Sequence, residues 1–437
     1  MKSIASVLSI IALGFGLVAC PGGGGDGGGV GGGTTGSTGF VYTANSGAAS
    51  DTISMFRVTP VTGVLGSAGA PVAAGTQPQQ VVLDRTGQFA FVANAGSADL
   101  SSYLINLDGS LSSLTVATPV GTTPRPPTID PLNRYLYVPN FGSDNLSVFT
   151  VNASSGALTL VGPFNTGGGP QAASLDSQGR FVWVNNVTAG TVSMFFINLN
   201  GSLTLAAGNP LNPLPTGASP QRVTFRTLGL KLFTFVANAG SGNVSVFEVR
   251  QTDGGVVGSP AGSPFAAGTT PSTVVVDPSG QFALVANSGS DNVSVYTINS
   301  AIGPLTGALT VVQNPDPLTL TPNFFPAGTN PQTVTVHPSG NFVYVANAVS
   351  NDVTAYTLNQ TTGVLAQVAG SPFTTGGANP QRVTIDSAGK FAFVSNKNSD
   401  TIAVYSINQT TGVLTSVTGS PFPTGAAPEQ ATTAGLF

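Results

Sequence analysis

A short pattern of aromatic and aliphatic residues recurs along the chain and predicts its β-strands. The pattern reads aromatic-x-aromatic-Val-x-Asn, and large side chains at alternate positions suit a strand, in which every second residue faces the same side. Successive copies are about 50 residues apart, the length of a four-stranded propeller blade. Six copies and two looser variants (the first and sixth) end at Asn45, Asn94, Asn140, Asn186, Asn238, Asn287, Asn347 and Asn396.

Turn-forming residues divide each repeat into four predicted strands. The first strand begins at a proline after a glycine-rich loop, as at Pro78, and ends in Asp-x-x-Gly, as from Asp84 to Gly87. Asp at the first and Gly at the fourth position favour a type I turn. The aromatic run is the second strand, a Gly/Ser/Asp/Asn loop leads to the third, and a Thr-Gly turn such as that at Gly363 leads to the fourth. These signals predict an all-β protein.

The two ends of the repeat region supply complementary fragments of one repeat. The aromatic run at Phe40 has no proline strand before it, whereas the segment from Pro428 to Gly435 resembles a proline strand with no aromatic run after it. Pairing the fragments completes a blade and leaves no open sheet edge. The sequence therefore predicts a β-propeller over residues 40–437, with eight blades and a ring closed by the C-terminal strand. A seven-bladed ring is the alternative.

The first 39 residues differ from the repeats and predict export with membrane attachment. Met1-Lys2 precedes an apolar run from Ile4 to Val18, which has the length of a signal-peptide core. The residues Leu-Val-Ala-Cys that end at Cys20 resemble the lipobox of bacterial lipoproteins, which implies cleavage after residue 19 and a lipid on Cys20. An ordinary secretory signal is the alternative. Residues 21–39 include 12 glycines, so we expect residues 20–39 to be a flexible linker.

Composition narrows the range of partners. Only 7% of residues are charged and the net charge is -4, whereas nucleic-acid binding needs a basic surface. One cysteine and one histidine exclude thiolate clusters and multi-histidine metal sites. We expect a monomer that contacts the membrane only through its lipid, in the outer membrane or at the cell surface.

The repeats resemble bacterial β-propellers of the YVTN-repeat and lactonase-like group, which includes propeller-type 6-phosphogluconolactonases and the cycloisomerase-2 proteins. Active members carry Arg-His after the blade proline and Glu after the aromatic strand. This chain has no His at the first place and no Glu at the second. Arg125, Arg222 and Arg382 match the basic part, and the resemblance implies that they would stabilise an oxyanion. No matched residue supplies the base that lactone hydrolysis needs.

Residues next to the blade prolines are the candidate ligand site, because they would surround one mouth of the central channel. Amides with few charges suit a polar or weakly anionic ligand. Equally, these side chains could serve only to satisfy backbone groups where the strands begin. The candidates are Gln79, Arg125, Gln171, Gln221, Arg222, Gln332, Gln381, Arg382 and Glu429.

Three aspartates and the single histidine are further candidates for metal binding or catalysis. Asp144, Asp291 and Asp352 lie in Asn/Asp-rich loops whose oxygens could bind Ca²⁺, although such residues also favour turns. His337 replaces the Asp of an Asp-x-x-Gly turn, so we expect it to cap that turn on the face opposite the blade prolines. We expect no other cofactor.

The sequence thus favours a non-catalytic binding or scaffold module of the cell envelope, which would use its channel mouth to bind a small polar ligand or an envelope protein. The alternative is a lactonase-like hydrolase acting on a lactone or an anionic sugar derivative. A surface attachment protein is a third interpretation, suggested by the repetitive exterior rich in Ser, Thr and Asn.

Overall fold

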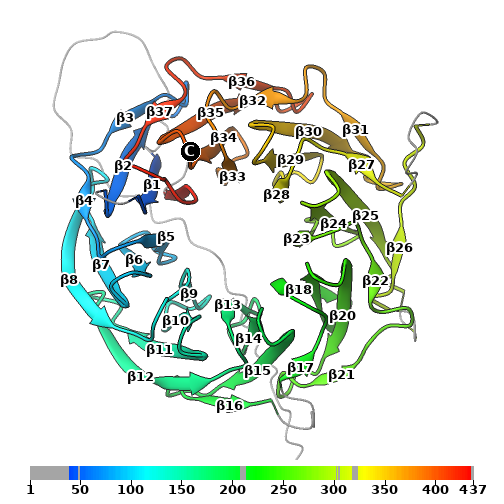
Figure 1. Cartoon of the computed structure of the whole chain (residues 1–437), viewed down its shortest axis with the longest axis horizontal. Coiled ribbons are helices and arrows are strands. Elements are labelled where there is room, and N and C mark those ends of the chain that lie inside the picture. The colour runs from blue at the N-terminus through cyan, green and yellow to red at the C-terminus, as the bar shows by residue number, and fades with distance from the viewer. Residues whose placement is uncertain are drawn as a thin grey trace, which may run out of the picture. The chain divides into compact units, whose positions relative to one another are not determined.

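The computed structural model describes residues 39–47, 50–206, 213–301, 303, 306–316 and 323–434. In these residues, eight separate antiparallel sheets form a ring (Figure 1), which confirms the eight-bladed β-propeller. The predicted signal peptide and nearly all of the predicted linker lie outside the described residues. No helix in the described part is long and apolar enough to cross a membrane.

Each blade has four strand positions, counted from the channel outward. The innermost position holds β5 (Pro78–Leu83), β9 (Thr128–Ile129), β13 (Pro170–Leu175), β18 (Pro220–Leu228), β23 (Pro271–Val276), β28 (Pro331–Val336), β33 (Pro380–Ile385) and β38 (Thr432–Ala434). The second position holds β6 (Phe89–Asn94), β10 (Tyr135–Asn140), β14 (Phe181–Asn186), β19 (Lys231–Asn238), β24 (Phe282–Asn287), β29 (Phe342–Asn347), β34 (Phe391–Asn396) and β1 (Gly39–Asn45).

The third position is also a single strand in every blade. It holds β7 (Asp99–Ile105), β11 (Asn145–Val151), β15 (Thr191–Ile197), β20 (Asn243–Val249), β25 (Asn292–Ile298), β30 (Asp352–Leu358), β35 (Thr401–Ile407) and β2 (Thr52–Val58). We number the blades along the chain, so that β1 and β2 belong to blade 1, β5 opens blade 2, and β33 opens blade 8.

The outermost position is continuous in two blades and split in six, where the sequence predicts a single fourth strand. Blades 2 and 3 have β8 (Leu111–Pro119) and β12 (Leu158–Asn165). In blades 5, 7 and 8 a serine hydroxyl at the break, such as Ser371 Oγ, accepts a hydrogen bond from the neighbouring strand, which replaces a backbone partner. The split pairs are β3 (Leu65–Ser67) and β4 (Val72–Ala73), β16 (Leu203–Leu205) and β17 (Leu214–Pro215), β21 (Val256–Gly258) and β22 (Phe265–Ala266), β26 (Leu309–Val311) and β27 (Phe325–Pro326), β31 (Leu365–Gln367) and β32 (Phe373–Thr374), and β36 (Leu414–Ser416) and β37 (Phe422–Pro423).

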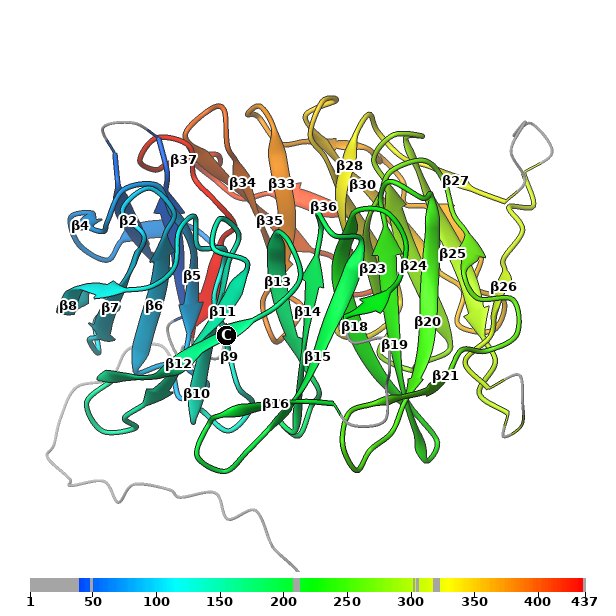
Figure 2. The same cartoon turned by 60° about the horizontal axis from the view of Figure 1, so that its bottom comes forward.

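The loops of the ring gather on two opposite faces (Figure 2). We call one the proline face, where innermost strands begin, as at Pro78, and second strands end, as at Asn94. The other is the turn face, which carries the Asp-x-x-Gly turns and the turns between third and fourth strands. The predicted type I turns are confirmed there, since the Gly87 amide donates to the Asp84 carbonyl at 3.1 Å.

The hydrophobic core lies between neighbouring blades and not at the centre of the ring. Second strands such as β6 are buried along their whole length, because another blade covers each side. The apolar residues form clusters that each join two adjacent blades, for example Phe89 and Phe91 of blade 2 with Leu136 and Phe149 of blade 3. This arrangement explains why the aromatic runs read as nearly continuous apolar segments.

The asparagine that ends each aromatic run holds two strands together. Asn94 is fully buried, and its amide donates to Asp99 Oδ1 at 2.6 Å and to Ser101 Oγ at 2.9 Å. A loop glycine packs on it, because a Cβ at Gly75 would lie 2.7 Å from the Asn94 amide nitrogen. The motif therefore fixes the connection between the second and third strands at the proline face.

A glycine in each outer turn packs on an aromatic ring of the preceding blade. At Gly63, which has a φ of 72°, a Cβ would lie 2.5 Å from the ring of Phe391. The same contact recurs around the ring, and Gly63 makes it across the seam between blades 8 and 1. The other pairs are Gly109 with Phe40, Gly156 with Phe89, Gly201 with Tyr135, Gly254 with Phe181, Gly307 with Phe233, Gly363 with Phe282 and Gly412 with Phe342.

The C-terminal strand closes the ring, as predicted. β38 pairs with β1 in antiparallel register, with Val41 opposite Thr433, and Asn45 forms a bridge with Pro428. Threonine hydroxyls tie β38 to the innermost strands on both sides. Thr384 Oγ1 donates to the Ala431 carbonyl at 2.9 Å, and Thr432 Oγ1 donates to the Val81 carbonyl at 2.7 Å.

Replacing Gly63 by alanine should lower the free energy of unfolding by about 2–4 kcal/mol, because the change combines a left-handed backbone with overpacking against Phe391. Gly66→Ala in β3 is the matched control, since nothing lies within 4 Å of a Cβ there, and it should change stability by less than about 0.5 kcal/mol. Denaturant unfolding of both variants measures the difference. Equal stabilities would show that the seam does not depend on this contact.

Candidate functional site

The central channel contains two adjoining cavities at the innermost strands. The first has a volume of about 230 Å³ and the second about 460 Å³, and both are lined by Gln80, Pro126, Arg222 and Gln430. Ligand pockets for small molecules commonly occupy about 300–1,000 Å³, so the two cavities together can hold a sugar-sized compound.

One position of the repeat supplies a residue from every blade to this lining. It is the second residue after each blade proline. The eight residues are Gln80, Pro126, Ala172, Arg222, Thr273, Thr333, Arg382 and Gln430. Only two of them are charged, and both are arginines.

Arg222 of blade 5 and Arg382 of blade 8 line the same cavity. The Arg382 guanidinium donates to Gln430 Oε1 at 3.0 Å, and neither arginine forms an ion pair with a described carboxylate. Arg222 is exposed to the channel and Arg382 is half-buried. Two unpaired guanidinium groups in one cavity form a natural site for an anion, which would accept charge-assisted hydrogen bonds from both.

The surroundings of the two arginines lower their pKa values. Solvent reaches Arg222 from the channel, but the enclosing blades replace most of the bulk water around it, and this desolvation lowers its pKa. Desolvation and the charge of Arg222 together lower the pKa of Arg382 to about 9. A bound anion would offset both effects.

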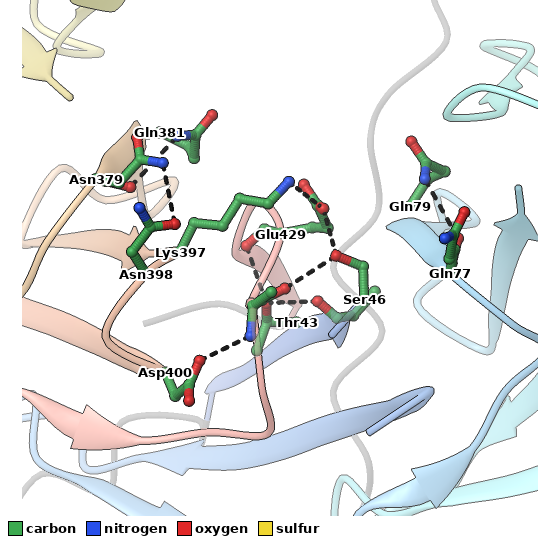
Figure 3. A network of polar contacts seen from close by, with 12 residues as sticks. Thr43, Ser46, Gln77, Gln79, Asn379, Gln381, Lys397, Asn398, Asp400 and Glu429 are labelled. Carbon is green, nitrogen blue, oxygen red and sulfur yellow. Dashed lines mark hydrogen bonds and ion pairs between the residues drawn. The ribbon is translucent and has the colours of Figure 1, made fainter. Parts of the chain in front are cut away.

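Glu429 lies at the rim of the same cavity and brings the carboxylate of the site. Its Oε1 atom accepts hydrogen bonds from Lys397 Nζ and Ser46 Oγ, each at 2.7 Å (Figure 3). Its backbone amide donates to the Ala44 carbonyl at 2.8 Å. The closing segment of the ring thus positions the Glu429 carboxylate at the cavity.

The glutamines that follow the blade prolines have a structural role. The side-chain amides of Gln79, Gln221 and Gln381 donate to the carbonyl of the residue before the proline, at 3.1–3.3 Å. Figure 3 shows two of these contacts. Those preceding residues, such as Gln77, have positive φ angles, so the glutamines support the left-handed turns that start the innermost strands.

The predicted glutamines nevertheless border the channel. Gln79, Gln332 and Gln381 line the first cavity, and Gln171 and Gln221 line the second. Gln332 donates its amide to Asn330 Oδ1. Four of them combine a hydrogen bond to their own turn with a place in the lining: Gln79, Gln221, Gln332 and Gln381.

Arg125 lies apart from the other two predicted arginines. Its guanidinium carbon is 4.6 Å from the centre of the Phe141 ring, its Nε atom has no hydrogen-bond partner among the described residues, and it lines neither channel cavity. Pro126 and Pro127 follow it, and because proline lacks an amide hydrogen, β9 is shortened to Thr128–Ile129.

The candidate metal ligands do not converge. Asp144, Asp291 and Asp352 belong to three different blades, and among the described residues no three His, Cys, Asp or Glu side chains form a group able to hold a metal. Asp144 Oδ1 and Asp291 Oδ1 instead accept backbone amides of the next proline loop, at 2.8 and 2.7 Å.

His337 caps its own turn at the turn face. Its Nδ1 accepts the Ser339 amide at 3.1 Å, and its Nε2 lies 2.9 Å from the Gly389 carbonyl of the next blade. The side chain is buried. It follows the end of β28 at the turn face, whereas Arg222 lies near the proline end of β18.

Sequence reasoning missed Gln80, Gln430 and Lys397. The first two share the second position after a blade proline with Arg222 and Arg382, and this shared place in the repeat was the available signal. Lys397 follows a strand asparagine at a position where several other repeats have Ala or Ser.

A family model described as "Lactonase, 7-bladed beta-propeller" matches residues 34–125, 128–220, 229–322 and 305–427. The ring described above has one blade more than that description. No curated protein sequence matches the chain.

Several solved structures share the fold over nearly the whole chain. The Pseudomonas aeruginosa periplasmic gluconolactonase PpgL has a TM-score of 0.58 at 18% identity, covering 92% of this chain and 100% of that chain. A candidate 6-phosphogluconolactonase from Bacteroides fragilis has a TM-score of 0.59 at 17% identity, covering 92% and 99%. Apo AztD from Citrobacter koseri has a TM-score of 0.58 at 13% identity, covering 92% and 99%. At these identities the likeness concerns the fold alone.

The pKa of Arg382 predicts how anion binding depends on pH. Gluconate should raise the melting temperature near pH 7, and this shift should shrink as pH rises through about 9, because Arg382 then loses its charge. Without gluconate, rising pH has the opposite effect on stability. Above about pH 9 the unfolded chain keeps the proton of Arg382 more tightly than the folded chain does, so Arg382 increases the free energy of unfolding as pH rises.

Thermal melts with and without gluconate across this range measure both effects. Arg382→Ala should remove the pH dependence of the gluconate shift, and Arg85→Ala at the turn face is the control that should keep it. A gluconate shift in the wild type that persists undiminished at pH 10–11 would contradict the lowered pKa.

Proposed function

The chain belongs to the lactonase family of β-propellers, and on this basis we propose that it binds an anionic lactone in the central channel and hydrolyses the lactone ring. The observation that carries the proposal is the pair Arg222 and Arg382, two guanidinium groups without a carboxylate partner in one cavity. Two of the structures with the same fold are named as a gluconolactonase and a candidate 6-phosphogluconolactonase, which supports a sugar lactone as substrate.

In the proposed reaction, the arginines bind the anionic group of the substrate and stabilise the developing oxyanion. Glu429 takes a proton from the attacking water. The water oxygen forms a bond to the lactone carbonyl carbon, the bond to the ring oxygen breaks, and the ring oxygen receives a proton to give the hydroxy acid. Lys397 and Ser46 hold one carboxylate oxygen of Glu429, which leaves the other oxygen for the water.

The non-catalytic binding module expected from the sequence is the second candidate. Active lactonase-like members have a His and a Glu at positions where this chain has neither, and this difference favours the binding module. The base proposed above, Glu429, stands at another position of the repeat. Both candidates use the same channel and the same anion, so one set of experiments separates them. The surface attachment role stays a prediction.

Lactone hydrolysis by the wild type and by three variants tests the proposal. Arg222→Ala/Arg382→Ala should lower kcat/KM about 100-fold or more, since two charge-assisted contacts are lost. Glu429→Gln should lower kcat with little change in KM, because it removes the base and keeps the shape. Lys397→Met, which keeps the Glu429 carboxylate, should retain turnover, and Arg85→Ala is the unaffected control.

A titration with gluconate distinguishes the outcomes. If the wild type is stabilised by gluconate but hydrolyses none of a panel of neutral, carboxylated and phosphorylated sugar lactones, the binding module is correct and the hydrolase is wrong. If turnover persists in Arg222→Ala/Arg382→Ala, the channel arginines are not part of the site.

We also propose that the protein is exported and anchored in the cell envelope, in the outer membrane or at the cell surface, by a lipid on Cys20. The signal-like run before Cys20 and the glycine-rich segment after it support this location. Cys20→Ser should abolish lipid attachment, which fractionation and mass spectrometry of the mature N-terminus measure. A lipid-modified N-terminus in Cys20→Ser, or an unmodified Cys20 in the wild type, would contradict the anchor.

A further inference from the structure

We propose that the turn face is a membrane-docking surface that inserts aliphatic side chains into a bilayer containing anionic phospholipids. The proposal goes beyond the proposed hydrolase, because it concerns the face opposite the blade prolines and none of the residues that line the cavity with Arg222.

The turn face carries the most exposed aliphatic side chains of the described residues. Leu107 is fully exposed, and Leu199, Leu230 and Val61 are 94%, 87% and 82% exposed. Leu132 is 60% exposed. Isolated exposed leucines are common on protein surfaces, but here the aliphatic side chains with the largest exposed fractions lie on one face.

These five residues occur once per blade in five consecutive blades. Val61, Leu107 and Leu199 lie in the turns between third and fourth strands of blades 1, 2 and 4, and Leu132 and Leu230 lie in the turns between first and second strands of blades 3 and 5. Hydrogen bonds connect some of these turns, since Tyr135 Oη donates to the Leu199 carbonyl at 2.6 Å. In blades 7 and 8 the corresponding outer turns contain Gln and Thr.

The N-terminal segment joins the propeller at this same face. β1 begins at Gly39, which pairs with Val58 at the base of the turn that contains Val61. The next residue, Phe40, contacts the turn that contains Leu107, because a Cβ at Gly109 would lie 2.1 Å from its ring. Only 19 positions of the sequence separate Cys20 from Gly39, so the lipid proposed on Cys20 would attach the chain to the membrane from this face.

Charged residues also differ between the two faces. On the turn face, basic side chains reach solvent, and Arg85 and Lys390 are exposed without an ion pair to a described residue. Most carboxylates of this face are buried or paired, apart from the exposed Asp108: Asp84, Asp130, Asp176, Asp277 and Asp386 are buried, while Glu248 and Asp253 pair with Lys231 and Arg250.

The proline face is the acidic one. Carboxylates outnumber cations there, and an anionic bilayer would repel this excess of negative charge. The carboxylates are Asp51, Asp99, Asp144, Asp291, Asp352, Asp400 and Glu429, and the cations are Arg125, Arg222, Arg382 and Lys397. Aliphatic side chains together with solvent-accessible cations are the combination that binds at an anionic membrane interface. The occupant that fits the turn face is therefore an anionic phospholipid surface, and docking there would leave the proline face open to solvent.

Vesicle sedimentation of the mature chain from residue 20 tests the proposal. The chain carries Cys20→Ser, so that no lipid contributes, and residues 1–19 supply none of the described strands. We expect it to bind vesicles of phosphatidylcholine with phosphatidylglycerol, to bind pure phosphatidylcholine less, and to bind less at high salt. Leu107→Ser/Leu199→Ser should lower the partition coefficient at least tenfold.

The matched control is Leu205→Ser/Val349→Ser, which removes two exposed aliphatic side chains outside the turn face, in β16 and in a loop of the proline face. It should bind as the parent does. All substituted residues are at the surface, and equal melting temperatures will show that the variants fold. Lactone hydrolysis or gluconate binding should be unchanged in both, so failure of docking and failure of the channel site are separable.

Three outcomes would overturn the proposal. In the first, the parent chain binds no vesicles. In the second, the leucine variant binds vesicles as the parent does. In the third, vesicle binding is absent and size-exclusion chromatography shows a dimer of the parent that the leucine variant does not form.

Discussion

The packing of each blade against the next is the constraint on which the rest of this structure depends. A blade on its own would expose two apolar surfaces, since its second strand carries large side chains on both sides. Each outer-turn glycine allows the neighbouring blade to approach until backbone lies on an aromatic ring, as Gly63 does on Phe391. Because every interface needs a partner on both sides, the chain has to return to its start, and β38 completes the blade that β1 opens.

Ring closure also explains why a polar site stands at the centre. The apolar clusters lie between the blades, and the innermost strands border the channel with partly exposed residues, as in β5. The repeat itself gives these channel positions little charge, and Arg222 and Arg382 depart from the pattern. They come from blades that are far apart in sequence, and Glu429 joins them only because the closing segment returns beside β1. The proposed site therefore exists only in the closed ring.

The sequence was sufficient for the architecture because its signals are local and repeated. The aromatic runs, the blade prolines and the Asp-x-x-Gly turns each act within one hairpin, and the two incomplete ends predicted the closure. The split outer strands were not predictable in this way, since a serine such as Ser371 replaces a backbone partner through the folded geometry. The contact of Gly63 with Phe391 could not be predicted from the sequence, because it joins residues of different blades.

The candidate site was predicted only in part, because residues at neighbouring positions of the innermost strands have different roles. The blade prolines lie at the end of the channel where the cavity with Arg222 and Arg382 is found, but residues directly after them, such as Gln221, bind the backbone of their own turns. Arg222 and Arg382 lie one position further and face the channel. Arg125 directly follows its proline, as Gln221 does, and packs on Phe141 instead. Both positions border the channel, and what separates them is the hydrogen bond that a glutamine directly after the proline makes to its own turn, which the sequence alone does not show.

The two faces of the ring are specialised by the same topology. Every first and third strand runs from the proline face to the turn face, so substitutions in the tight turns change only one face and leave the channel lining untouched. Leu107 and Leu199 stand two residues before the turn glycines Gly109 and Gly201, and their side chains are exposed. An apolar residue at this place therefore costs the packing between blades little and leaves the channel lining unchanged. The described chain begins at Gly39 on the turn face, opposite the end of the channel where Glu429 lines the cavity, so the proposed docking and the proposed ligand site would use opposite faces of one ring.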